Sequence, residues 1–242
     1  MFYNYGGVKV YFSFKNGQSK SPILLLHGWG VDSEIFKGIW QSFPDRVFLC
    51  IDFPPFGKSQ KTIEDFTIYT YVALVMSLCE HLGIEKCDIL AHSFGGRVAS
   101  ILASVKCSLV HSCILIGSAG LKPRRNLKYY YKIYKYKLLK KLGRSTLNLG
   151  SKDYKMLDEG MKKTFNSIVN EDLLAYYKNV HCPCLLIWGE KDDQTPLYMA
   201  KKLKKILPKS NLVIIKDAGH FCFLTNPLSV NKLLGKFWEE NA

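Results

Sequence analysis

Six short apolar runs recur along the chain, and segments with helical periodicity stand between most of them. The runs cover residues 22–28, 46–53, 86–93, 112–120, 183–190 and 211–219. Each is almost continuously apolar, which is typical of strands that are covered on both faces. Apolar residues recur at helical spacing in residues 65–83, 96–106, 196–207 and 227–240. This alternation predicts an α/β fold in which helices flank a mostly parallel central sheet.

The amino-terminal residues 1–18 alternate like two short strands around Gly6 and Gly7. They lack the basic start, apolar block and small-residue cleavage site of a signal peptide. No apolar run approaches the roughly 18–20 residues that span a bilayer. A length of 242 residues suits one α/β domain with an inserted part.

The alternation is interrupted once, between Leu121 and His181. This stretch has polar-rich helical patterns and no run that is typical of a buried strand. An insertion between two strands, at one edge of the sheet, would have this pattern. We therefore expect residues 1–120 and 181–242 to form the core and residues 121–180 to form a small helical cap.

Positive charge is concentrated in the same stretch. The formal net charge is +14, and residues 121–163 hold fourteen Lys and Arg against three acidic residues, a balance of +11. Within it an apolar stripe recurs every four residues, with lysines on the other faces, at Tyr130, Tyr134, Leu138 and Leu142. We favour a cap helix that rests on the mouth of the site and has a solvated basic exterior. The charge also suits an acidic carrier protein or an anionic membrane surface, whereas no recognition motif indicates nucleic acid.

The chain contains eight cysteines. Most of them, such as Cys50 and Cys113, lie inside apolar runs, where reduced buried thiols are expected. Cys182 and Cys184 are one residue apart with no second pair, unlike a zinc site or a redox motif. This pattern favours a cytoplasmic protein.

One serine stands where a strand pattern gives way to a helix pattern, in "LAHSFGGRVA", residues 90–99. Two glycines after Ser93 allow a sharp turn that exposes its hydroxyl and directs the backbone N–H of Phe94 at the same point. The motif departs from G-x-S-x-G because Ala91 replaces the first glycine. Ser93 could be a nucleophile or only the N-cap of the following helix.

A nucleophilic serine needs a base and a group that orients the base. His220 directly follows a strand pattern and Gly219, which makes it the best placed of the six histidines. His92 adjoins Ser93 on the strand, so its side chain is expected on the opposite face. Three others stand at the edges of helix or strand patterns and are expected to face solvent or the wrong end of the sheet: His81, His111 and His181. His27 belongs to the strand pattern of residues 22–28.

Two acids follow another strand pattern, in "WGEKDDQTP", and either Asp192 or Asp193 could orient the base. Both give the chain order Ser, Asp, His. An earlier strand ends in "HGWG", residues 27–30, whose backbone could supply a second donor to an oxyanion.

Together these segments resemble the α/β-hydrolase superfamily, and the resemblance covers nearly the whole chain. "HGWG", "DFPPFGKS" (residues 52–59), "AHSFGG", "WGEKDDQTP" and "DAGH" stand in the family's order. The second departs from the usual loop motif only at Pro55, where glycine is common. The resemblance implies a triad of Ser93, Asp192 and His220, with Asp192 favoured over Asp193. It also implies an oxyanion hole formed by the backbone N–H groups of Trp29 and Phe94.

The resemblance implies a serine hydrolase that needs no metal and no organic cofactor, with a small-molecule carboxylic ester as the simplest substrate. "HGWG" and "FGKS" are also similar to esterases that act on pimeloyl methyl esters held by a carrier protein. Hydrolases of carbon–carbon bonds share the layout, and some lyases of this fold carry "GGR", as this chain does at Arg97. Arg97 could form a structural salt bridge, or it could bind a carboxylated substrate. The alternative function class is a docking protein, in which the basic cap binds an anionic partner and catalysis is secondary.

Overall fold

The computed structural model describes residues 1–61, 66–122, 131, 134, 138 and 159–241. Eight strands form one sheet in the order β1-β2-β4-β3-β5-β6-β7-β8. Their bounds are β1 Phe2–Tyr5, β2 Val8–Lys15, β3 Ile23–Leu26, β4 Phe48–Ile51, β5 Cys87–His92, β6 Val110–Ile116, β7 Cys184–Gly189 and β8 Ser210–Ile215. β2 pairs antiparallel with β1 and β4, and all other pairs are parallel. The predicted mostly parallel sheet, with two short strands at its start, is confirmed.

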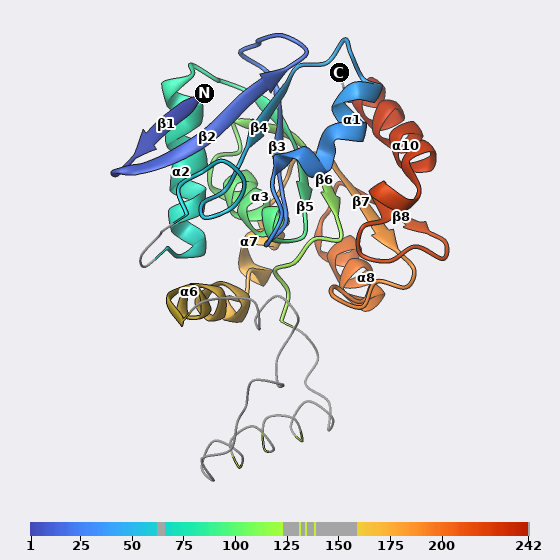
Figure 1. Ribbon diagram of the computed structural model, residues 1–242. Helices are drawn as coiled ribbons and strands as arrows, with labels where there is room; N and C mark the ends of the chain where they lie inside the picture. Colours follow the sequence, from blue (N-terminus) through green and yellow to red (C-terminus); the bar gives the residue numbers. More distant parts are fainter. Residues whose placement is uncertain (62–65, 123–130, 132–133, 135–137, 139–158, 242) are drawn as a thin grey trace.

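Helices cover both faces of this sheet (Figure 1). One face carries η1 Ser33–Phe36, α1 Lys37–Ser42, α9 Cys222–Thr225 and α10 Pro227–Glu240. The other carries α2 Ile68–His81, α3 Phe94–Val105, α6 Glu159–Asn170, α7 Leu174–Lys178 and α8 Leu197–Ile206. The four helices expected from periodicity are α2, α3, α8 and α10, while η1, α1 and α9 were not predicted.

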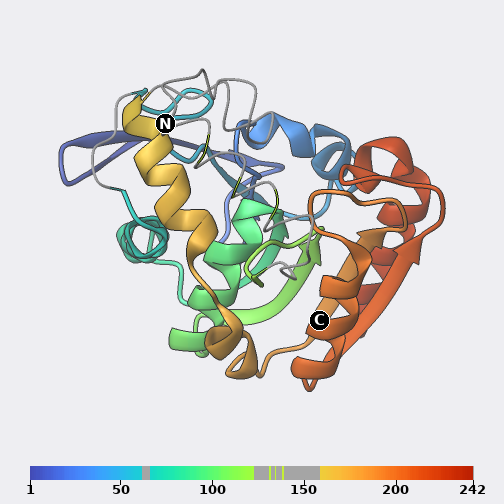
Figure 2. The ribbon, with the colours of Figure 1, turned by 90° about the horizontal axis from the view of Figure 1, so that it is seen from below.

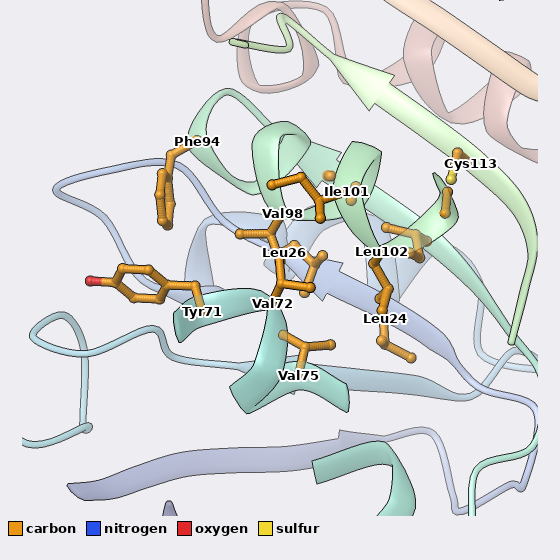
Figure 3. Packing of buried hydrophobic residues seen from close by; sticks show 14 of the residues in the cluster. Leu24, Leu26, Tyr71, Val72, Val75, Phe94, Val98, Ile101, Leu102 and Cys113 are labelled. Carbon is orange, nitrogen blue, oxygen red and sulfur yellow. The ribbon is translucent and has the colours of Figure 1, made fainter. Parts of the chain in front are cut away.

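The central strands are buried on both sides, as their continuous apolar runs predict. Leu24 and Leu26 of β3 belong to the core layer under α2 and α3, whereas Ile23 and Leu25 belong to the layer under α1 and α10. Figure 3 shows Leu24 and Leu26 in the first layer with Val72 of α2. Alternate residues of one strand therefore hold helices against opposite faces.

The stretch expected to form a cap lies largely outside the described residues. Of its apolar stripe, Tyr134 and Leu138 are helical and exposed, and Tyr130 and Leu142 lie outside the described residues. The described end of the stretch comprises α6 and α7, and α7 packs against α3 through the buried Tyr177.

All eight cysteines lie in the described parts as free thiols. Six are buried, Cys182 is half-buried and Cys107 is exposed; the buried ones are Cys50, Cys79, Cys87, Cys113, Cys184 and Cys222. Within the described ranges, no helix has the length and apolar character that crossing a bilayer requires.

The strand order reverses direction at β3, which makes this strand the switch point of the sheet. The chain passes from β3 to β4 on one side and then returns to β5 on the other side of β3. Loops that follow β3 and β5 therefore diverge and leave a crevice at the carboxyl ends of these strands, the usual ligand site of open α/β sheets. The segments of Trp29 and Ser93 follow β3 and β5, so both lie at this crevice.

Candidate active site

Ser93 occupies a sharp turn between β5 and α3. Its backbone has φ 49° and ψ −109°, an uncommon conformation for a residue with a side chain. The turn is possible because α3 approaches the sheet closely at its first residues. A Cβ at Gly95 would overlap the carbonyl oxygen of Leu26, and a Cβ at Gly96 would overlap the hydroxyl of Ser118. The two glycines thus let the helix start directly against the strands.

The hydroxyl of Ser93 is not used to cap α3. Ser93 stands at the N-cap position, yet its side chain makes no capping hydrogen bond. It borders a cavity of about 330 Å³ instead, which His220 borders as well. Of the two interpretations of this serine, the geometry therefore favours the one that leaves its oxygen free for chemistry.

Asp192 and His220 are buried and hydrogen-bonded to each other. His220 Nδ1 lies 2.8 Å from Asp192 Oδ2. The Thr195 hydroxyl donates to the same oxygen at 2.9 Å, and the backbone N–H groups of Gln194 and Thr195 donate to Oδ1, each at 2.9 Å. Burial raises the pKa of Asp192, but the hydrogen bond and charge of His220, with the bonds from Thr195, outweigh it and lower the pKa overall. Asp192 is therefore an ionised partner for the imidazole.

The neighbouring Asp193 is exposed and lies in no such contact. The structure thus brings Asp192, rather than Asp193, to His220. Gly117, at the end of β6, lies against this pair, because a Cβ there would stand 3.1 Å from His220 Nδ1 and 3.3 Å from Asp192 Oδ2. Its φ of 51° also favours glycine.

The second ring nitrogen of His220 has no hydrogen-bond partner in the described part of the chain, although it is buried. Since Asp192 holds Nδ1, Nε2 is the nitrogen that remains for proton transfer at the cavity. The walls of this cavity are mostly aromatic and glycine residues: Gly28, Trp29, Gly30, Val31, Phe56, His92, Ser93, Gln194, His220 and Phe221. Ser93 and His220 therefore meet in a largely apolar pocket.

The segment after β3 lies directly beside Ser93. A Cβ on Gly28 would stand 3.4 Å from Ser93 Cβ, and the rings of Trp29 and Phe94 have centroids 5.4 Å apart. Among the described residues, the backbone N–H groups of Trp29 and Phe94 donate to no other group. Two unbonded donors thus flank the serine, at the residues that the resemblance implies for an oxyanion hole.

A hydrogen-bonded scaffold fixes this segment. His27 is buried, and its Nε2 accepts the backbone N–H of Phe53 at 2.8 Å while Nδ1 donates to the Gly28 carbonyl at 2.7 Å. Burial lowers the pKa of His27, which suits a neutral ring that both donates and accepts. Asp52 accepts the backbone N–H of Ser33 at 3.0 Å and that of Lys58 at 2.8 Å. The motif "DFPPFGKS" therefore supports the loops around the cavity.

His92 corrects one expectation. Strand alternation predicted its ring on the face opposite to Ser93, but both residues border the same cavity, because the chain leaves the strand at Ser93. His92 Nε2 lies 3.2 Å from the carbonyl oxygen of His220, and the two rings have centroids 4.7 Å apart. His92 thus supports the backbone of the candidate base, and this position agrees with its exclusion as the base.

The other candidate residues lie away from the cavity. His81 and His181 are exposed, and His111 is partly buried 3.2 Å from Asp88. Arg97 is buried, does not line the cavity, and among the described residues bonds to backbone carbonyls rather than to a carboxylate. In the described ranges no group of three His, Cys, Asp or Glu is placed to hold a metal ion.

Thr195 and Gly117 also belong to this site, although neither was predicted from the sequence. Thr195 carried a signal, since it stands three residues after Asp192 and before Pro196, where a turn can direct its hydroxyl and N–H back to the carboxylate. Gly117 carried no such signal, because it lies inside the apolar run of residues 112–120.

Comparison with known proteins identifies the fold family of this chain. The family model for the alpha/beta hydrolase fold matches residues 21–136 and 125–227. The chain belongs to the alpha/beta hydrolase fold family. It is 26% identical to the uncharacterized hydrolase YugF of Bacillus subtilis (strain 168), over 96% of this chain and 94% of that protein. It is 24% identical to a pimeloyl-[acyl-carrier protein] methyl ester esterase of Proteus mirabilis (strain HI4320), over 91% of this chain and 93% of that protein.

Solved structures agree on the fold. MGS-M2, an alpha/beta hydrolase enzyme from a Medee basin deep-sea metagenome library, superposes with a TM-score of 0.79 at 20% identity, and the match covers 99% of this chain and 97% of the other. The α/β-hydrolase fold predicted from the sequence is confirmed by the family model and by this structural match.

Proposed function

We propose that this α/β hydrolase cleaves a carboxylic ester through an acyl-enzyme on Ser93. One observation carries the proposal. Ser93 lies in a strained turn, its hydroxyl does not cap α3, and it shares a cavity with His220, which is hydrogen-bonded to the buried carboxylate of Asp192. About two-fifths of the chain separates Ser93 from Asp192, and about half of it separates Ser93 from His220. Their convergence at one crevice supports a catalytic role over a structural one.

The geometry supports the following sequence of steps. His220 Nε2 takes the proton of Ser93 as its oxygen attacks the ester carbonyl, and Asp192 stabilises the resulting imidazolium. The N–H groups of Trp29 and Phe94 stabilise the negative oxygen of the tetrahedral intermediate. His220 returns the proton to the leaving alcohol, and water then releases the acid by the same steps. The aromatic lining favours an uncharged acyl group of small or medium size.

Hydrolysis of p-nitrophenyl esters of increasing chain length tests this proposal. We expect turnover by the wild type and a loss of about 10⁴-fold or more in kcat for Ser93→Ala, because the nucleophile is removed. Ser100→Ala is the matched control, since that hydroxyl lies on the same helix and bonds to the carbonyl of Arg97 at 2.9 Å. Equal turnover by the two variants would contradict the proposal.

A second candidate substrate is an ester held on an acidic carrier protein. The balance of +11 in residues 121–163 favours it, and a relative at 24% identity is named for such a substrate. The charge would raise the association rate of an acidic partner. The chemistry at Ser93 would be the same.

A further inference from the structure

Arg97 lies on α3, one turn after Ser93, and points away from the cavity toward the end of α6. Its buried guanidinium donates to the carbonyl oxygens of Ile168 at 2.9 Å, Val169 at 3.3 Å and Glu171 at 3.1 Å. Carbonyls in the last turn of a helix have no partner within the helix and carry its negative dipole end. A buried cation that satisfies three carbonyls at this end therefore caps α6 with a side chain from another helix.

Two further contacts hold the same end of α6. The hydroxyl of Tyr69, at the start of α2, donates to Glu171 Oε1 at 2.8 Å. The backbone N–H of Leu173 donates to the carbonyl of Gly120 at 2.9 Å. In the view from below, α6 runs beside the ends of α2 and α3 (Figure 2). Its carboxyl end is thus tied to α2, to α3 and to the loop after β6.

The other observation concerns what α6 carries. Phe165 stands one turn before Ile168, and its ring lies 5.3 Å from that of Trp29, centroid to centroid. Trp29 lines the cavity, and its backbone N–H is one of the two unbonded donors beside Ser93. The position of α6 therefore fixes the packing behind one wall of the cavity.

We infer that Arg97 is a positioning residue that fixes α6, and through Phe165 and Trp29 the acyl-binding wall, relative to the helix that bears Ser93. This inference rests on the proposed esterase function. Arg97 contacts α6 and does not line the cavity. Its removal therefore loosens the wall formed by Trp29, while Ser93, His220 and Asp192 keep their contacts. Esters whose acyl chain reaches the wall then bind less well, and acetyl esters react almost as before.

Steady-state kinetics with p-nitrophenyl acetate and p-nitrophenyl hexanoate test the inference. For Arg97→Met we expect the KM of the hexanoate to rise about tenfold, while kcat and the KM of the acetate change less than about twofold. Arg97→Lys should recover part of the loss, because an ammonium keeps a charged donor for these carbonyls. Lys106→Met is the matched control, since it removes the same charge from the exposed end of α3.

A second variant serves if Arg97→Met does not fold. Tyr69→Phe removes the exposed hydrogen bond to Glu171 and should raise the KM of the hexanoate about twofold to threefold. Hydrogen exchange gives a readout independent of activity: the amides of residues 165–170 should lose protection in Arg97→Met and keep it in Lys106→Met.

The outcomes separate the two proposals. A wild type that hydrolyses neither ester contradicts the proposed function, and exchange then tests the hold on α6 alone. An active wild type, with an unchanged KM for the hexanoate in both Arg97→Met and Tyr69→Phe, overturns the inference. An equal loss of kcat for both esters in folded Arg97→Met also overturns it, because it would mean damage to the reacting groups.

Discussion

At the residue scale, Asp192 accepts hydrogen bonds on both carboxylate oxygens. Its four donors come from His220, Thr195 and Gln194, and its pKa is lowered overall. An ionised Asp192 can accept only from a protonated Nδ1 of His220, which leaves Nε2 unprotonated toward the cavity. The acid therefore sets the tautomer that the proposed reaction needs.

Asp192→Asn should lower kcat by about 10⁴-fold, because an amide stabilises the imidazolium less and permits the wrong tautomer. Asp193→Asn is the matched control, since Asp193 is exposed and should change kcat less than about twofold. Stopped-flow or steady-state turnover of p-nitrophenyl acetate measures both. A similar loss in the two variants would disagree with the geometry.

His92 makes a second prediction at this scale. Burial, and then the charge of His220, lower the pKa of His92 to about 3. The unfolded chain binds a proton there below about pH 6.5 and the folded chain does not, so stability is lost as the pH falls from 6.5 toward 3. Between pH 7 and pH 5 this one group should cost about 2 kcal/mol of unfolding free energy.

His92→Gln keeps a donor for the His220 carbonyl and has no titration in this range. Between pH 7 and pH 5, urea unfolding should show that the variant loses about 2 kcal/mol less unfolding free energy than the wild type does. His81→Gln, on the exposed end of α2, controls for the removal of a histidine. Equal losses in wild type and His92→Gln would mean that His92 is not buried as a neutral ring.

At the element scale, the start of α3 lies against the end of β3, and glycine makes this approach possible. A Cβ at Gly95 would overlap the carbonyl carbon and oxygen of Leu26. Because these atoms belong to the backbone of a central strand, they cannot move aside as a flexible side chain could. The turn at Ser93 and the position of the Trp29 segment both depend on this contact.

Gly95→Ala should therefore destabilise the protein by about 2–4 kcal/mol, as overpacking against backbone does, and reduce turnover in the fraction that folds. Gly38→Ala is the matched control, because a Cβ there meets nothing within 4 Å in α1. That change should be neutral or stabilise by up to about 1 kcal/mol. Thermal unfolding of both variants measures the difference, and an unaffected Gly95→Ala would argue against this packing.

The elements that could be predicted are those with a long pattern of their own. The continuous apolar runs of the six core strands and the periodicity of α2, α3, α8 and α10 are strong signals. η1, α1 and α9 have four to six residues each, too few for a periodic pattern. The predicted position of the His92 ring relative to Ser93 was wrong, because the strand ends at His92 whereas the apolar run continues to Ser93. The backbone of Ser93 and the contacts of Arg97 depend on tertiary packing, which no local pattern encodes.

At the scale of the whole molecule, the charge is unevenly distributed along the chain. Of the net +14, a balance of +11 falls in residues 121–163, which follow β6 and include the first residues of α6. A local excess of this size attracts acidic partners over a distance that salt shortens, since the Debye length is about 10 Å at 0.1 M. An acidic carrier protein is one of the partners that we propose on this ground, beside an anionic membrane surface.

Turnover of an ester linked to an acidic carrier protein should fall about tenfold or more between about 0.05 and 0.5 M salt, whereas turnover of a free ester should change little. Replacing Arg124 and Arg125 by Glu should mimic high salt for the carrier-linked ester alone. Lys201 and Lys202, exposed on α8, give the control for the same change of charge. Salt-insensitive turnover of the carrier-linked ester would exclude docking by this segment.

The central claim is that Ser93 is the nucleophile of an α/β hydrolase, and covalent labelling tests it most directly. A fluorophosphonate reacts with a serine only when its hydroxyl is activated in a folded site. Peptide mass spectrometry of the labelled wild type should place one adduct on Ser93, and heat-denatured protein and Ser93→Ala should carry none. A folded wild type without an adduct, or an adduct that persists on another residue in Ser93→Ala, would contradict the account.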